Sequence, residues 1–114
     1  MDKDFPLFQK EFKRWQQRFG LTGYEVHFKY EPIDDAFAEI SLDQEEMTAT
    51  VRLNSKLSDK DKPHKDIKRD AKHEALHLLS GRLQADGKER FISATEIYEA
   101  TEELVNRLMG LIND

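Results

Sequence analysis

The stretch Tyr24-Glu25-Val26-His27-Phe28-Lys29-Tyr30 alternates apolar and polar side chains along its whole length. Successive side chains of a β-strand point to opposite faces, so this alternation predicts a strand with one buried face. A weaker alternation covers residues 36–42, and a clear one covers residues 47–53. The polar residues 43–46 between them predict a hairpin turn. Together these segments predict a short three-stranded antiparallel sheet.

A helix is predicted before the strands. Four aromatic residues there follow one another at spacings of four, three and four, and so form one stripe of an amphipathic helix: Phe8, Phe12, Trp15 and Phe19. An aromatic stripe at this spacing is typical of a core contact. We expect Asp4 to cap the start of this helix and Gly20 to follow its end in the left-handed conformation.

Two further helices are predicted after the strands. The first should begin near residues 61–63 and run to Ser80, with Gly81 as its stop. The second should begin at Ser93, where Ser93 and Glu96 have the spacing of a capping box, and run to about Ile112. The predicted fold class is α+β: an N-terminal helix, the three-stranded sheet, then two helices, with the helices on one face of the sheet.

Composition limits the classes of function. The 114 residues are enough for one domain spanning 1–114, and 36% of them are charged. No apolar run is long enough to span a bilayer, and the charged first residues argue against a signal peptide. We therefore expect a cytoplasmic protein without membrane contact. The net charge of -5 argues against nucleic-acid binding, and the absence of cysteine means that a metal would need histidine and carboxylate ligands.

One segment is locally basic. Its cations are interleaved with Asp59, Asp61, Asp66 and Asp70, which favours a solvated helix face with internal ion pairs over a nucleic-acid patch. The cations are Lys56, Lys60, Lys62, Lys65, Lys68, Arg69 and Lys72.

Directly after this basic segment the sequence reads His73-Glu74-Ala75-Leu76-His77. On a helix, residues four apart lie about 6 Å apart along the axis and point the same way, so both imidazoles can reach one zinc ion. The glutamate after the first histidine can then accept a proton from a water at the metal, which makes Glu74 the candidate general base. The competing interpretation is a pair of surface histidines on a charged helix.

The sequence leaves the third metal ligand open. A longer zinc motif with a third histidine is excluded, because Ser80 and Leu83 occupy the positions that it needs. The remaining ligand would be a glutamate of the last helix, or else His27 or His64. That helix has an expected apolar face of Ile97, Thr101, Leu104, Leu108 and Leu111, widened by Val105 and Ile112. It also has four glutamates, of which Glu102 falls nearest the face; the others are Glu96, Glu99 and Glu103.

At these residues the chain resembles a known family. It is similar to the small H-E-x-x-H zinc metallopeptidase domains with a glutamate third ligand, the compact gluzincin-like proteins often encoded by phages and prophages. The resemblance rests on His73 to Leu79, on Glu89 to Ser93, and on Glu102 to Leu108. It implies that His73, His77 and Glu102 are the metal ligands and that Glu74 is the general base.

The sequence therefore predicts a zinc-dependent hydrolase that acts on a peptide or protein substrate and binds one Zn²⁺ per chain. Two histidines and a carboxylate also suit Fe(II), Co and Ni, so the metal itself is not fixed. Tyr98, one turn before Glu102, is a candidate oxyanion stabiliser or an aromatic at the margin of the core. The alternative function is a non-catalytic zinc-binding or protein-interaction module with the same fold.

Overall fold

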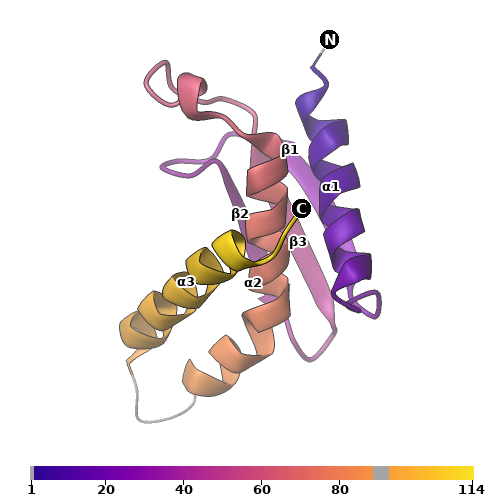
Figure 1. The fold of residues 1–114 in the computed structure, drawn as a ribbon, viewed down its shortest axis with the longest axis vertical. Helices are drawn as coiled ribbons and strands as arrows, with labels where there is room; N and C mark the ends of the chain where they lie inside the picture. Colours follow the sequence, from indigo (N-terminus) through magenta and orange to yellow (C-terminus); the bar gives the residue numbers. More distant parts are fainter. Residues whose placement is uncertain (1, 89–92) are drawn as a thin grey trace.

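The structure is a computed structural model that describes residues 2–88 and 93–114. It has α+β architecture, which confirms the predicted fold class (Figure 1). The elements in chain order are α1 (Asp4–Arg18), β1 (Glu25–Glu31), β2 (Ala38–Asp43), β3 (Thr48–Asn54), the 3-10 helix η1 (Lys62–His64), α2 (Ile67–Lys88) and α3 (Ala94–Leu111). Within the described residues, none of the helices is both long enough and apolar enough to cross a bilayer.

The sheet is mixed, so the prediction of a fully antiparallel sheet is wrong for one of its two pairings. The strand order is β1-β3-β2. β2 runs antiparallel to β3, with Ile40 opposite Val51, whereas β1 runs parallel to β3, with Phe28 opposite Val51. The central strand is therefore the last one in the chain, and it is inserted between the first two.

Asn54 at the end of β3 bonds to the connection between β1 and β2. Its side-chain nitrogen donates to the carbonyl oxygens of Ile33 and Ala36, at 2.9 and 2.8 Å. Its side-chain oxygen accepts from the N–H groups of Ile33 and Lys56, at 3.1 and 2.9 Å. This buried amide holds residues 32–37 in a wide connection, which leaves the slot that β3 fills. Alternation along a strand carries no signal for such a contact.

The hairpin between β2 and β3 forms at the predicted turn. The carboxylate of Asp43 accepts the N–H of Glu46 at 3.1 Å, as Asp commonly does in turns. Met47 was expected to begin the third strand, but it belongs to the turn and has a φ of 51°. Strand β3 therefore begins one residue later, at Thr48.

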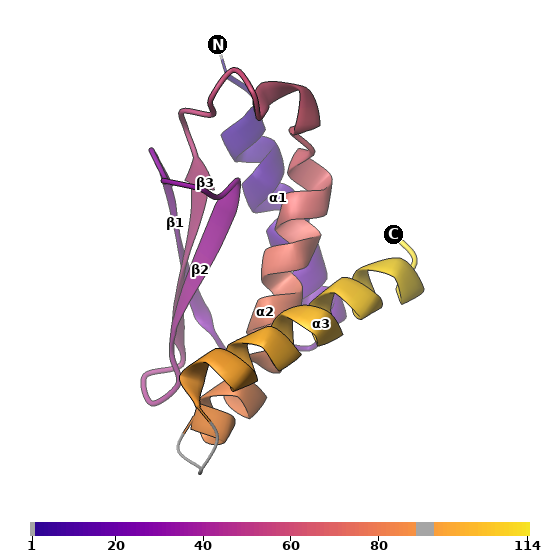
Figure 2. The same cartoon turned by 90° about the vertical axis from the view of Figure 1, so that its left-hand side faces the viewer.

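Helices α1 and α2 cover one face of the sheet (Figure 2). The aromatic stripe of α1 lies in the core, as predicted: Phe8, Phe12 and Trp15 are buried and Phe19 is partly buried. The rings of Phe8 and Phe12 meet that of Phe28 edge to face, at centroid distances of 6.4 and 5.5 Å. Such pairs stabilise a core beyond the apolar area that they bury.

The ends of α1 differ in how well they were predicted. Lys3 occupies the N-cap position without a side-chain hydrogen bond, so the prediction that Asp4 caps the helix is wrong. Asp4 instead lies in the first turn, where its N–H donates to the carboxylate of Asp2 at 2.8 Å. At the other end Gly20 has a φ of 72°, which confirms the predicted left-handed position.

Helix α2 begins later and ends later than predicted. Residues 62–64 form the separate turn η1, and the carboxylate of Asp66 accepts the N–H of Arg69 at 3.1 Å at the start of α2. Gly81 does not stop the helix. It is buried inside the helix, where an added Cβ would lie 2.2 Å from a methyl carbon of Leu42. This glycine allows α2 to lie directly on β2, and a close approach of that kind is invisible in sequence.

Helix α3 crosses α2 rather than extending the helical layer (Figure 2). Its start is as predicted, because the hydroxyl of Ser93 accepts the N–H of Glu96 at 3.1 Å. Its buried residues are Thr101 and Val105, whereas Leu104 and Leu111 are 38% and 76% exposed. The predicted apolar face therefore includes both buried residues, but Leu104 and Leu111 of that face are exposed.

The basic segment is only partly a solvated face. Lys62 pairs with Asp59 at 3.2 Å within the segment, while Lys65 reaches Asp4 of α1 at 2.7 Å. Lys72 is 4% exposed, so the prediction that it belongs to the solvated face is wrong.

Candidate metal centre

Both histidines of the motif lie on α2 and point away from its buried side. Ala71, Ala75 and Leu78 are buried against the core and fix the rotation of the helix about its axis. That rotation leaves His73 and His77 partly accessible, with side chains 23% and 12% exposed. Their ring centroids are 4.8 Å apart, so the helix aligns the two imidazoles as the spacing of four residues predicts.

Glu102 of α3 completes the cluster. Its Oε1 lies 2.6 Å from Nε2 of His77, and its Oε2 lies 3.7 Å from Nε2 of His73. One ligand atom from each of the three residues lies within 4.8 Å of the other two. The buried residues Thr101 and Val105 set the rotation of α3 and so turn Glu102 toward α2.

The other glutamates of α3 have different surroundings. Glu96 accepts the hydroxyl of Ser93 at 3.2 Å as part of the helix cap. Glu103 pairs with Arg107 at 2.8 Å on the exposed side, and Glu99 is exposed. Of the four glutamates considered from sequence, the structure therefore brings Glu102 to the histidines.

The two alternative histidines lie apart from this cluster. His27 is exposed on the face of the sheet opposite the helices, with its Nε2 3.6 Å from a carboxylate oxygen of Glu25. His64 lies in η1, so the expectation that it shares a helix with His73 is wrong. It lines the same groove as the cluster but is not one of the three residues whose ligand atoms converge.

The cluster fits a tetrahedral metal ion. With metal–ligand distances of about 2.0–2.1 Å, the ligand atoms of a tetrahedral site lie about 3.3–3.4 Å apart. The distances of 2.6 and 3.7 Å from Glu102 to the two imidazoles lie on either side of that value. Small side-chain rotations would reconcile them, and two imidazoles with one carboxylate form a ligand set that zinc accepts.

Glu74 contacts the ring nitrogen of His73 that faces away from Glu102. The Glu74 side chain is 8% exposed, and its Oε2 lies 3.2 Å from Nδ1 of His73. This hydrogen bond is the main reason why the pKa of His73 is raised, although burial opposes it. A proton held on Nδ1 leaves the Nε2 lone pair directed at Glu102, which is the orientation that metal binding requires.

A groove of about 820 Å³ runs past the cluster. Its walls are the β2 segment from Ala36 to Leu42, the exposed side of α2, and α3. Tyr98 lines it from α3, one turn before Glu102, and is 54% exposed. The candidate oxyanion stabiliser therefore lies on the groove rather than in the core.

Asp70 is a groove residue that the sequence reasoning did not single out. Its Oδ2 is buried without a hydrogen-bond partner. Burial raises the pKa of Asp70 to about 6, and the nearby carboxylates of Glu74 and Asp66 add to the effect. The spacing of four between Asp66, Asp70 and Glu74 places all three on one helix face and could have drawn attention to it.

Comparison with known proteins adds no family to this description. No family model matches the chain, and neither a curated protein nor a solved structure matches it significantly. The fold and the geometry of the cluster are therefore known from the structure alone. The resemblance to small zinc metallopeptidases stays a prediction.

Proposed function

We propose that the protein is a zinc-dependent hydrolase that cleaves peptide bonds. The observation that carries the proposal is the convergence of His73, His77 and Glu102 beside a groove, with Glu74 hydrogen-bonded to the first histidine. The sequence motif supplies the first two ligands on one helix, and the third comes from another helix. If the histidines were only a chance pair on the surface, no carboxylate from another helix would be expected beside both of them.

The number of ligands favours a catalytic site over a structural one. Structural zinc sites are closed by four protein ligands, whereas catalytic sites use three and keep one position open. The group in residues 2–88 and 93–114 has three members, and it faces the groove. A substrate could therefore approach the open position.

Each residue has a distinct task in the proposed reaction. A bound zinc would supply Lewis acidity, which polarises a carbonyl and lowers the pKa of water. In the proposed reaction Glu74 turns from Nδ1 of His73 toward the attacking water, accepts its proton and then delivers it to the leaving amine. Tyr98, whose side chain lines the groove, can donate its hydroxyl to the developing oxyanion.

The free edge of β2 supports a peptide substrate. Within the described sheet β2 pairs with β3 alone, so its other edge carries unpaired backbone groups. That edge forms one wall of the groove. An extended peptide can add to such an edge through main-chain hydrogen bonds, which would hold it alongside α2.

Two variants test the proposal when compared with the parent protein. Zinc content is measured by mass spectrometry after metal-free protein has been reloaded, and cleavage is measured with a library of quenched fluorescent peptides. We expect about one zinc per chain in the parent, none in His77→Ala, and zinc without cleavage in Glu74→Gln. His27→Gln on the far face of the sheet is the matched control and should behave as the parent.

The outcomes separate the hydrolase from the alternative binding module. A Glu74→Gln protein that cleaves as fast as the parent would refute the assigned role of Glu74. Zinc binding without cleavage of any peptide by the parent would favour a binding module. Failure of the parent to bind zinc would refute both readings of the cluster.

A further inference from the structure

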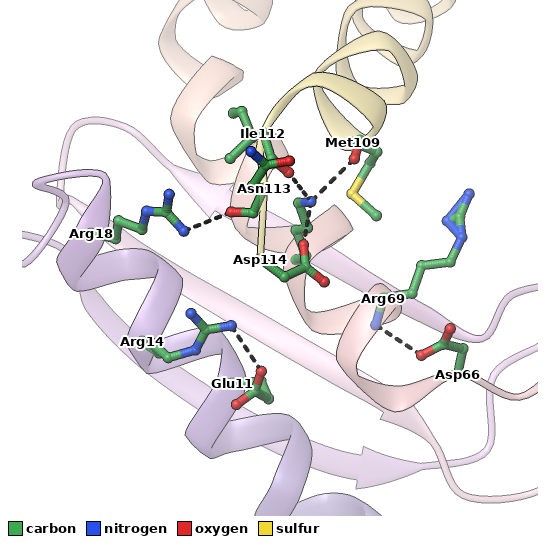
Figure 3. A network of polar contacts seen from close by, with 10 residues as sticks. Glu11, Arg14, Arg18, Asp66, Arg69, Met109, Ile112, Asn113 and Asp114 are labelled. Carbon is green, nitrogen blue, oxygen red and sulfur yellow. Dashed lines mark hydrogen bonds and ion pairs between the residues drawn. The ribbon is translucent and has the colours of Figure 1, made fainter.

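Lys72 is a buried lysine whose ammonium is fully hydrogen-bonded. Its Nζ donates to the carbonyl oxygens of Met109 and Ile112, at 3.1 and 2.5 Å, and to the carboxylate of Asp114 at 2.5 Å. An ammonium has three donors, so none is left over. Figure 3 draws these contacts at the point where the end of α3 returns to the body of the protein.

These contacts close the C-terminal end of α3. The last carbonyls of a helix lack partners within the helix and carry the negative end of its dipole, so a cation placed there stabilises the end. The same ammonium lies 5.2 Å from the ring centroid of Trp15, a buried residue of α1. Arg18 of α1 adds a second link, because its guanidinium donates to the carbonyl of Asn113 at 2.8 Å.

The clamp made by Lys72 adds polar links to a packing contact in which few residues of α3 are fully buried. Of its 18 residues, Thr101 and Val105 are the buried ones. Glu102 lies seven residues before Met109, a separation of about 10 Å along a helix axis. Lys72 directly precedes His73 in the chain, so the clamp and the metal-binding imidazoles belong to the same turns of α2.

We infer that Lys72 is a positioning residue for the metal centre: it ties the end of α3 to α2 and so sets where Glu102 stands relative to His73 and His77. The inference rests on the proposed metal site. Without the clamp the end of α3 would lose its hydrogen bonds to α2, and the docking of α3 that holds the carboxylate between the imidazoles would loosen. Lys72 does not bind the metal; it acts through the position of the third ligand.

Electrostatics makes this role distinguishable from a simple charge effect. A positive charge near a site for a dication repels the ion, so removing a lysine should by itself tighten zinc binding. Loss of the position of Glu102 should instead weaken zinc binding. A fall in zinc affinity on removal of Lys72 therefore reports the loss of geometry.

The test is a competition titration of zinc against a chromophoric chelator. For Lys72→Met we expect a 10- to 100-fold loss of affinity, the size typical of losing a residue that orients a ligand. Lys72→Arg keeps the charge and some of the donors and should recover part of the loss. Lys68→Met removes an exposed lysine one turn earlier on the same helix and should bind zinc as tightly as the parent or slightly more tightly.

A double-mutant cycle with Glu102→Gln tests the route of the effect. If Lys72 acts through Glu102, the double variant should bind zinc no more weakly than Glu102→Gln alone. Additive losses would show that Lys72 acts by another route and would overturn the inference. Parent-like or tighter binding by Lys72→Met would overturn it as well, while leaving the proposed metal site intact.

Two further results keep the test decisive. If the parent binds no zinc, the proposed function fails and the inference fails with it. If Lys72→Met does not fold by circular dichroism, the milder Arg18→Gln and Asp114→Asn changes, which remove single links to the end of α3, replace it in the titration. A several-fold loss of zinc affinity in their combination would support the inference, and unchanged affinity would overturn it.

Discussion

The body of the molecule and helix α3 differ in how many of their residues are fully buried. The body consists of α1, the sheet and α2, joined by a continuous core in which Phe8, Phe12 and Val51 are fully buried. Helix α3 buries Thr101 and Val105, while Leu111 near its end is 76% exposed. The proposed metal centre spans this boundary, with two ligands on the body and one on α3. Changes in the docking of α3 should therefore change the metal affinity. They should have little effect on the stability of the body.

The largest expected effect is on the body. Phe12→Ala deletes a fully buried ring that meets Phe28, and such deletions cost about 3–5 kcal/mol. Val105→Ala on α3 should cost less in global stability, because it removes fewer buried atoms than Phe12→Ala, but it should weaken zinc binding. Urea unfolding of both metal-free variants measures the first difference, and zinc titration the second. Equal losses of stability would contradict the division into a body and a weakly held helix.

Zinc itself should sharpen the comparison. At a free concentration 100-fold above its dissociation constant, a ligand that binds only the native state adds about 2.7 kcal/mol of stability. Thermal unfolding with and without a chelator measures this term. In hydrogen exchange, α3 should gain more protection than β1 or α1, because of these three elements only α3 carries a proposed metal ligand. Uniform protection across the chain would argue against separate docking of α3.

Gly81→Ala should break the contact between α2 and β2 within the body. The new methyl group would lie 2.2 Å from a methyl carbon of Leu42 and 2.9 Å from the side-chain nitrogen of Gln44, so these two side chains must move. Overpacking of this kind costs about 1–3 kcal/mol. Gly110→Ala in α3 is the matched control, because a Cβ there meets nothing within 4 Å. In urea unfolding, Gly110→Ala should leave the stability unchanged or raise it slightly. If Gly81→Ala also left the stability unchanged, that result would contradict the close approach of α2 and β2.

Asp70→Asn should stabilise the metal-free protein in a pH-dependent way. The pKa of Asp70 is raised to about 6 in the folded state, from an ordinary value of 3.8, so folding favours its protonated form. This contribution is fully present below pH 4 and is lost as the pH rises through 6. The variant should therefore match the parent near pH 4 and exceed it above pH 6, as measured by unfolding across that range in chelator. A constant difference at all pH values would contradict the cause.

The smallest expected effect is at the hairpin. Met47 has a φ of 51°, a region where a side chain is strained, and 45% of its surface is exposed. Met47→Gly should relieve roughly 1 kcal/mol of backbone strain, less whatever flexibility the glycine adds to the unfolded chain. Thermal unfolding measures the gain. A loss of stability would indicate that the contacts of the Met47 side chain outweigh the strain.

Patterns that depend on neighbours in sequence predicted well. The period of two in β1 and β3 and the aromatic stripe of α1 each report one element that buries one face, and the structure has all three. The pairing of the two histidines was equally predictable from the sequence, because a helix alone brings residues 73 and 77 together. The capping serine of α3 is another local signal, and it also holds.

What failed depends on contacts between distant segments. The parallel pairing of β1 joins strands that are distant in the chain, Gly81 lies inside α2 against Leu42 of β2, and Lys72 is buried by the end of α3. Sequence patterns rank Glu102 only slightly above its neighbours for the same reason: the register between α2 and α3 is set by packing. Lys72 shows the problem most clearly, since it was indistinguishable from its exposed neighbours in a basic segment.

The order of the strands also bears on how the chain folds. β2 and β3 are joined by a short turn, so their hairpin is a local unit of the kind that forms in about 1–10 μs. In the sheet that the structure describes, β1 pairs with β3 alone, so its parallel pairing needs β3 to be brought back across the β2 hairpin and is the non-local step of sheet formation. Asn54, at the end of β3, bonds to residues 33 and 36 of the connection between β1 and β2. The buried amide therefore stabilises the non-local pairing that completes the surface on which α2 and its histidines pack.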